Sequence, residues 1–136
     1  MIYEFEVEGD VVGKERPRVN MTTGHVYTPT KTKDYEYLVQ QSFRIKYPNV
    51  KQISDRVFVE IVAYMKIPKS TSKKQREEML DNTISPTKKP DVDNIAKSIL
   101  DAMNKFILVD DNQVSKIMVE KRYGEIPKVF VRIQTY

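Results

Sequence analysis

Four aspartates stand close together in the sequence, in two pairs. Asp91 and Asp93 follow two lysines and a proline, and Asp110 and Asp111 follow an apolar segment. Carboxylates gathered this closely repel one another unless a positive charge lies among them. Magnesium suits such a set, because it prefers oxygen ligands, keeps several of its waters and is usually held by one or two carboxylates together with substrate phosphates. The residue types and their spacing therefore indicate a cation site, with Mg²⁺ as the ion.

Two other uses of paired aspartates fit the sequence poorly. An EF-hand calcium loop that began at Asp91 would have Ile95 at its third ligand position and Ala96 where the loop needs glycine. A phosphatase of the haloacid-dehalogenase type needs its nucleophilic aspartate at the end of a buried apolar strand, whereas Pro-Thr-Lys-Lys-Pro precedes Asp91. Neither chemistry is indicated here.

Each acid also has an ordinary structural explanation. Asp91 could cap a helix, Asp93 and Lys97 could form an exposed i, i+4 pair, and Asp110-Asp111-Asn112 could be only a turn. The combination favours a site, because a basic loop leads into the acids and Lys97 lies one helical turn beyond Asp93.

A helix is predicted over residues 92–106, because apolar residues recur there with helical spacing. The members of this stripe are Val92, Ile95, Ala96, Ile99, Met103 and Phe106. With the stripe in the core, Asp93, Lys97 and Asp101 stack four residues apart on another face. Asp91 stands before the helix, where the backbone N–H groups favour an anion.

The remaining pattern predicts a single α+β domain over residues 1–136, with a small mixed β-sheet packed against two or three helices. Alternating or apolar segments predict strands over residues 2–8, 56–67, 115–123 and 128–135. A helix over about 33–47, capped by Thr30 or Thr32 and stopped by Pro48, and a short polar helix over 70–80 complete the set. The turn that follows the 92–106 helix can bring Asp110 and Asp111 back near Asp91 and Asp93.

Composition narrows the class of protein. The chain has no cysteine, which excludes a disulfide scaffold and any thiolate metal site. No apolar run approaches a membrane span, and Met1 leads directly into an alternating segment, so a cytoplasmic protein is expected. The net charge of +4 suits a polyanionic partner. The lone His25 excludes a nuclease that needs paired histidines on this chain.

The acidic region resembles the RusA family of Holliday-junction resolvases. The shared pattern is D-x-D-N at Asp91, Asp93 and Asn94, a lysine at Lys97, L-D-A around Asp101, and D-D-x-x-V from Asp110. A looser resemblance covers K-x-R-P-R at 14–18 and Y-T-P at 27–29. Residues 106–109 depart from it, since they read Phe-Ile-Leu-Val where the family carries a glycine and an aromatic residue.

The resemblance implies a homodimeric, Mg²⁺-dependent endodeoxyribonuclease that resolves four-way DNA junctions by paired symmetric nicks. Asp91, Asp93 and Asp111 would be the catalytic acids and hold one or two Mg²⁺ ions, and Lys97 would be the catalytic lysine. Three further polar residues would support them from behind: Asn94, Asp101 and Asp110. Contacts with backbone phosphates are expected from the basic residues Lys14, Arg16, Arg18, Lys69, Lys73, Lys74, Lys88 and Lys89.

Two other functions stay open on the sequence alone. A non-catalytic nucleic-acid-binding module would explain the basic loops, but it leaves the acids unexplained, because carboxylates near phosphates are unfavourable without a metal. A metal-dependent nuclease that acts on other branched DNA, such as flaps, explains the acids equally well.

Overall fold

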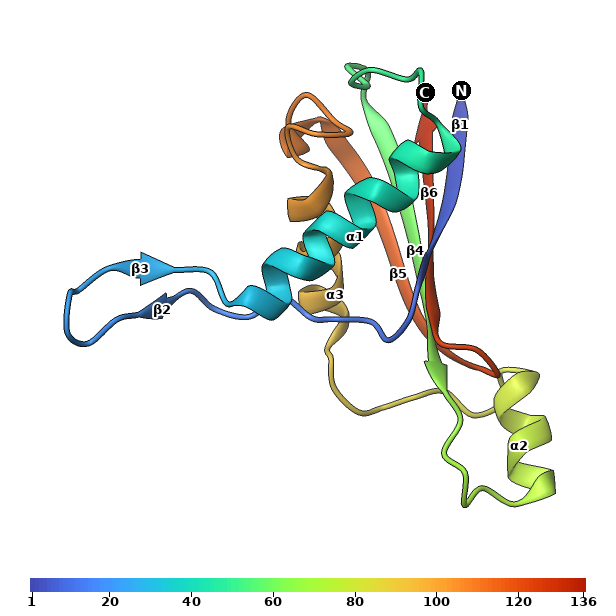
Figure 1. Ribbon diagram of the computed structural model, residues 1–136. Coiled ribbons are helices and arrows are strands. Elements are labelled where there is room, and N and C mark those ends of the chain that lie inside the picture. Colours follow the sequence, from blue (N-terminus) through green and yellow to red (C-terminus); the bar gives the residue numbers. More distant parts are fainter.

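A four-stranded mixed sheet forms the centre of the protein in the computed structural model, which describes all residues from 1 to 136 (Figure 1). Its strands are β1 (Ile2–Glu8), β4 (Val57–Lys66), β5 (Val114–Gly124) and β6 (Lys128–Thr135), in the order β1-β6-β4-β5. β4 and β5 are parallel, and the other neighbours are antiparallel. The predicted α+β class and the four predicted strands are confirmed, and each strand ends within one residue of its expected limits.

The parallel pairing of β4 with β5 determines where the acidic segment lies. Parallel neighbours cannot be joined by a tight turn and need a long crossover. Here the crossover carries α2 (Lys73–Leu80) and α3 (Val92–Met103). α3 returns along the same face of the sheet as α1 (Thr30–Lys46), and the two helices pack against each other (Figure 1).

One apolar core lies between the sheet and these two helices. Alternate residues of β4 are fully buried, from Val57 to Ala63, as are Ile95, Ile99 and Met103 of α3. From α1, Phe43 packs edge-on against Phe5 of β1, with their ring centroids 5.5 Å apart. The buried stripe of α3 therefore fixes its rotation and leaves its polar face, with Asp93 and Lys97, outside the core.

The helix ends differ from the predictions. α1 begins at Thr30 with Pro29 in the N-cap position, and Thr32 is buried inside the helix, so neither threonine caps it. α3 ends at Met103 because Asn104 is extended and Lys105 has a φ of 61°. Val92, assigned to the apolar stripe, is exposed.

A small hairpin lies between β1 and α1, a segment for which the sequence pattern predicts neither a strand nor a helix. It consists of β2 (Arg18–Val19) and β3 (Val26–Tyr27), which pair only with each other. It projects away from the sheet beside the start of α1 (Figure 1). None of the helices has the length and apolar character that a membrane crossing requires.

Candidate functional site

A polar cavity of about 790 Å³ lies along the exposed face of α3. Three segments line it: residues 14–17, α3 with the residue before it, and the start of η1 (Asp111–Gln113). The lining residues are Lys14, Glu15, Arg16, Pro17, Asp91, Asp93, Asn94, Lys97, Leu100, Asp101 and Asp111. Leu100 and Pro17 are the only apolar side chains among them. The cavity is therefore suited to a charged or strongly polar ligand.

The expected catalytic residues lie together in this cavity without protein partners of their own. Asp91 occupies the N-cap position of α3, yet its side chain accepts no capping hydrogen bond. Asp93 and Lys97 form no ion pair, although they are four residues apart on the helix. The ordinary structural explanations for these residues, a cap and a surface pair, therefore do not account for them.

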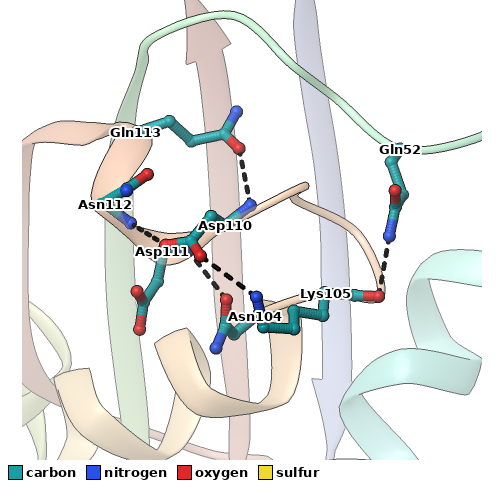
Figure 2. A network of polar contacts seen from close by, with 7 residues as sticks. All are labelled: Gln52, Asn104, Lys105, Asp110, Asp111, Asn112 and Gln113. Carbon is teal, nitrogen blue, oxygen red and sulfur yellow. Dashed lines mark hydrogen bonds and ion pairs between the residues drawn. The ribbon is translucent and has the colours of Figure 1, made fainter.

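Asp111 reaches the cavity because its loop is tied to the end of α3. The backbone N–H of Asp111 donates to Oδ1 of Asn104, the residue that terminates α3, over 2.9 Å. Asp110 caps η1 by accepting from the N–H of Asn112 at 2.9 Å (Figure 2). The side chain of Asp111 lies beside the carboxyl of Asp110 and also lines the cavity.

Gln113 connects the same loop to the segment before β4. Its Nε2 donates to the carbonyl oxygens of Ile53 and Asp55, at 2.8 and 2.6 Å. Figure 2 shows its Oε1 accepting from the N–H of Asp110, at 3.0 Å. The N–H of Asn112, followed by Lys105 at 3.2 Å, lowers the pKa of Asp110. Asp110 does not line the cavity, and its contacts cap η1, the turn that begins with Asp111.

Lys14 joins the N-terminal segment to the two helices. Its Nζ lies 2.9 Å from Oε1 of Glu36 on α1 and 3.1 Å from Oδ2 of Asp101 on α3. Partial burial works to lower the pKa of Lys14, but the hydrogen bonds and charges of these two carboxylates outweigh it and raise the pKa. Lys14 therefore stays charged and holds Asp101 in place.

Two contacts that position Asp91 were not predicted from the sequence. Nζ of Lys121, on β5, donates to the carbonyl oxygens of Lys88 and Pro90, at 2.8 and 3.2 Å. Gly13 packs so closely that a Cβ there would lie 2.7 Å from Cβ of Pro90. A lysine in a charged strand and a glycine in a loop are common, so no local pattern marks either residue.

The basic residues that were expected to contact phosphates differ in their distance from the acids. Arg16 lines the cavity, and Lys89 lines an adjoining one of about 570 Å³ that it shares with Asp91. Arg18 lies on β2 and Lys88 in the link before Asp91. Lys69, Lys73 and Lys74 belong to α2 and the turn before it, which do not line the cavity. Of these residues, Arg16 and Lys89 share a cavity lining with the aspartates.

The chemical type of the candidate ligands suits Mg²⁺. All three expected ligands are carboxylates, which supply the hard oxygen atoms that magnesium prefers. None of the three forms an ion pair with a basic side chain, so their charges are available to an ion. In this structure, no three acidic side chains are close enough together to coordinate one ion, and binding would require Asp91, Asp93 and Asp111 to converge.

Comparison with known proteins is consistent with this geometry. The profile of the family described as "Endodeoxyribonuclease RusA" matches residues 8–134. The chain is also 36% identical over 135 residues to the Bacillus subtilis (strain 168) protein described as "Uncharacterized protein YqaN". That alignment covers 96% of this chain and 94% of the relative.

Proposed function

The chain belongs to the RusA endodeoxyribonuclease family, and we propose that it is a Mg²⁺-dependent enzyme that resolves four-way DNA junctions by paired symmetric nicks. As a member of this family it is a phosphodiester hydrolase that acts on DNA. The observation that carries the proposal is the cavity on α3, which Asp91, Asp93, Asp111 and Lys97 line together without an ion pair among them.

Asp91, Asp93 and Asp111 are the proposed ligands of one or two Mg²⁺ ions. A bound magnesium ion would stabilise charge on the scissile phosphate and lower the pKa of a water molecule for in-line attack. The three carboxylates confine that chemistry to one end of α3. Asn94, Asp101 and Asp110 support them, Asp101 through its ion pair with Lys14 and Asp110 through the cap of η1.

Lys97 is the proposed electrostatic catalyst. Its ammonium group faces the same cavity as the acids and is not neutralised by Asp93. A positive charge fixed beside the phosphate stabilises the extra negative charge of the transition state more than that of the ground state. Lys97 therefore accelerates cleavage without adding much to junction affinity.

Phosphate contacts are proposed for the basic residues around the cavity, and more distantly for those of α2. They are Lys14, Arg16, Arg18, Lys69, Lys73, Lys74, Lys88 and Lys89. Such contacts supply affinity that depends on salt and not on base sequence. For an enzyme that cleaves DNA, the cytoplasm is the expected location.

A homodimer is proposed because a four-way junction with two-fold symmetry presents two equivalent scissile strands. A C2 dimer supplies two active sites related by the same symmetry. Sedimentation of the free protein and of its junction complex tests this part independently of cleavage. A monomer in both states would contradict it.

The experiment that tests the function compares substrates under identical conditions. A mobile four-way junction, a 5′-flap and a linear duplex of equal length are incubated with the protein in Mg²⁺ and in EDTA. The proposal predicts cleavage of the junction in Mg²⁺ alone. Preferred cleavage of the flap would point to a nuclease of another branched-DNA specificity, and binding without any cleavage would point to a non-catalytic module.

A further inference from the structure

The β2–β3 arm, residues 16–27, has no packing partner within the fold. Its two strands are two residues long and pair only with each other, and every residue of the arm is exposed. An isolated two-stranded hairpin is at best marginally stable in water. Figure 1 shows the arm extended away from the sheet and the helices. A segment held out in this way is available to a ligand.

The arm exposes an unusual density of large apolar side chains. They are Val19, Met21, Val26 and Tyr27. Val19 and Val26 are paired across the hairpin and therefore share one of its faces, while Met21, 94% exposed, stands at the tip. Single exposed apolar residues are ordinary, but several together on a short projection mark a binding surface.

The turn of the arm is ordered without any contribution from the Met21 side chain. Oδ1 of Asn20 accepts from the N–H groups of Thr22 and Thr23, at 2.9 and 3.2 Å. The N–H of Gly24 donates to the carbonyl oxygen of Asn20 at 2.7 Å, and Gly24 has a φ of 71°, which favours glycine. The fold therefore gives no structural reason for a methionine at the tip.

Charge identifies the kind of ligand. Residues 16–33 contain four Lys and Arg side chains, two of them in the arm, and no acidic one. Arg18 lies 3.3 Å from Glu15 at the base of the arm, in an exposed pair that a phosphate can replace. The base of the arm is continuous with the candidate site, because Arg16 and Pro17 line the same cavity as Asp91 and Asp93. A polyanion bound at that cavity would extend along the arm. The ligand of the arm needs negative charge for the arginines and an apolar surface for the tip. DNA has both, in its phosphates and in the faces of its bases.

We propose that the β2–β3 arm enters the branch point of the DNA, with Arg16 and Arg18 on flanking phosphates and Met21 inserted beside the bases at the crossover. DNA-binding proteins use apolar side chains, methionine included, to part stacked bases. Parting is easiest where stacking is already disturbed, as at a branch. This inference rests on the proposed function and assigns the preference for branched DNA over duplex to Met21.

The test uses Met21→Ser, with Ca²⁺ in place of Mg²⁺ to separate binding from cleavage. The probes are a four-way junction with 2-aminopurine beside the crossover and a linear duplex with the same base. Wild-type protein should raise the 2-aminopurine fluorescence of the junction. Met21→Ser should bind the junction about tenfold more weakly, equivalent to roughly 1.4 kcal/mol, without the fluorescence rise. Its duplex affinity should stay within about twofold, and Met21→Leu should restore both junction properties.

Ile45→Ser is the matched control. Ile45 is also exposed and apolar, but it lies in the last turn of α1, at the opposite end of that helix from the arm. It should behave as the wild type. Thermal melting should show that both serine variants are folded. If Met21→Ser is not, Met21→Gln, which keeps the side-chain length and makes it polar, should show the same loss of junction binding and fluorescence.

Three results would overturn the inference. The first is unchanged junction binding and fluorescence in Met21→Ser. The second is an equal loss of affinity for junction and duplex. The third is a loss of affinity that sedimentation traces to dissociation of a dimer, which would assign the arm to contact with a second copy of the chain. Failure of the proposed function is distinct, because wild-type protein would then leave a junction uncut in Mg²⁺. Failure of the arm alone leaves wild-type cleavage intact.

Discussion

Asp93 and Lys97 lie four residues apart on α3, yet they do not pair. An exposed pair at this spacing stabilises a helix by only about 0.3–0.5 kcal/mol, so leaving it unmade costs little. Both groups instead face the cavity that also contains Asp91 and Asp111. At the scale of single residues, helix stability does not explain why Asp93 and Lys97 stay unpaired. A ligand that combines a cation for the carboxylates with a phosphate for the lysine would explain it.

Replacing Asp93 by asparagine should abolish cleavage while junction binding is preserved or becomes tighter. The substitution keeps the shape of the side chain, removes a proposed metal ligand and takes a negative charge away from the phosphates. Cleavage in Mg²⁺ and binding in Ca²⁺ measure the two effects. Asp101→Asn is the control and should matter much less, because Asp101 is paired with Lys14. Joint loss of binding and cleavage in a folded Asp93→Asn protein would count against a metal role.

Lys97→Ala should slow cleavage by roughly 10²–10³-fold and leave junction affinity nearly unchanged, because the ammonium acts mainly on charge that grows in the transition state. Single-turnover cleavage at saturating enzyme and Mg²⁺ measures this rate. A rate within about threefold of the wild type, a barrier change of ~0.65 kcal/mol, would refute the catalytic role. Lys97→Arg then separates charge from geometry, since partial rescue means that charge suffices.

At the scale of elements, close packing and backbone hydrogen bonds bring the site residues together. The segment 14–17 reaches α3 because Gly13 lies against Pro90 and the N–H of Lys14 donates to the carbonyl oxygen of Asn94 at 3.0 Å. Asp111 reaches it through Asn104, and Lys121 fixes the link that precedes Asp91. Residues outside the expected catalytic set therefore position the segments that carry the acids.

Gly13→Ala should destabilise the protein by about 1–3 kcal/mol, the usual cost of overpacking, and should also slow cleavage. The new Cβ would lie 2.7 Å from Cβ of Pro90 and 3.3 Å from Cβ of Asn94, and neither of these atoms is the far end of a flexible side chain. Denaturant unfolding and junction cleavage measure the two effects. Unchanged stability and activity would show that the loop adapts without disturbing Asp91.

The sequence predicted the strands and helices well and their junctions less well. The apolar stripe of α3 identified the helix and its polar face, because burial follows helical spacing. It could not show that α3 stops at Met103, since that end depends on the positive φ of Lys105 and the bond from Asp111 to Asn104. The hairpin was missed because two-residue strands carry no periodicity, and Lys121 was missed because its contacts are with distant backbone oxygens.

At the scale of the whole molecule, positive charge adjoins the acidic site on the N-terminal side. Arg16→Ala should weaken junction binding to a similar degree on junctions of different sequence and reduce the slope of log affinity against log salt by about 1. Lys46→Ala is the matched control, because this substitution also removes one positive charge and Lys46 is exposed at the far end of α1. A drop in melting temperature with an unchanged slope would instead assign Arg16 a structural role.

The most direct test of the central claim is to map, at nucleotide resolution, the products that the wild-type protein makes from a mobile four-way junction in Mg²⁺. Two metal-dependent active sites related by two-fold symmetry predict paired nicks at equivalent positions on two opposing strands, with ligatable 5′-phosphate ends and no product in EDTA. No cleavage in Mg²⁺, cleavage that persists in EDTA, or single nicks scattered along the arms would contradict the account.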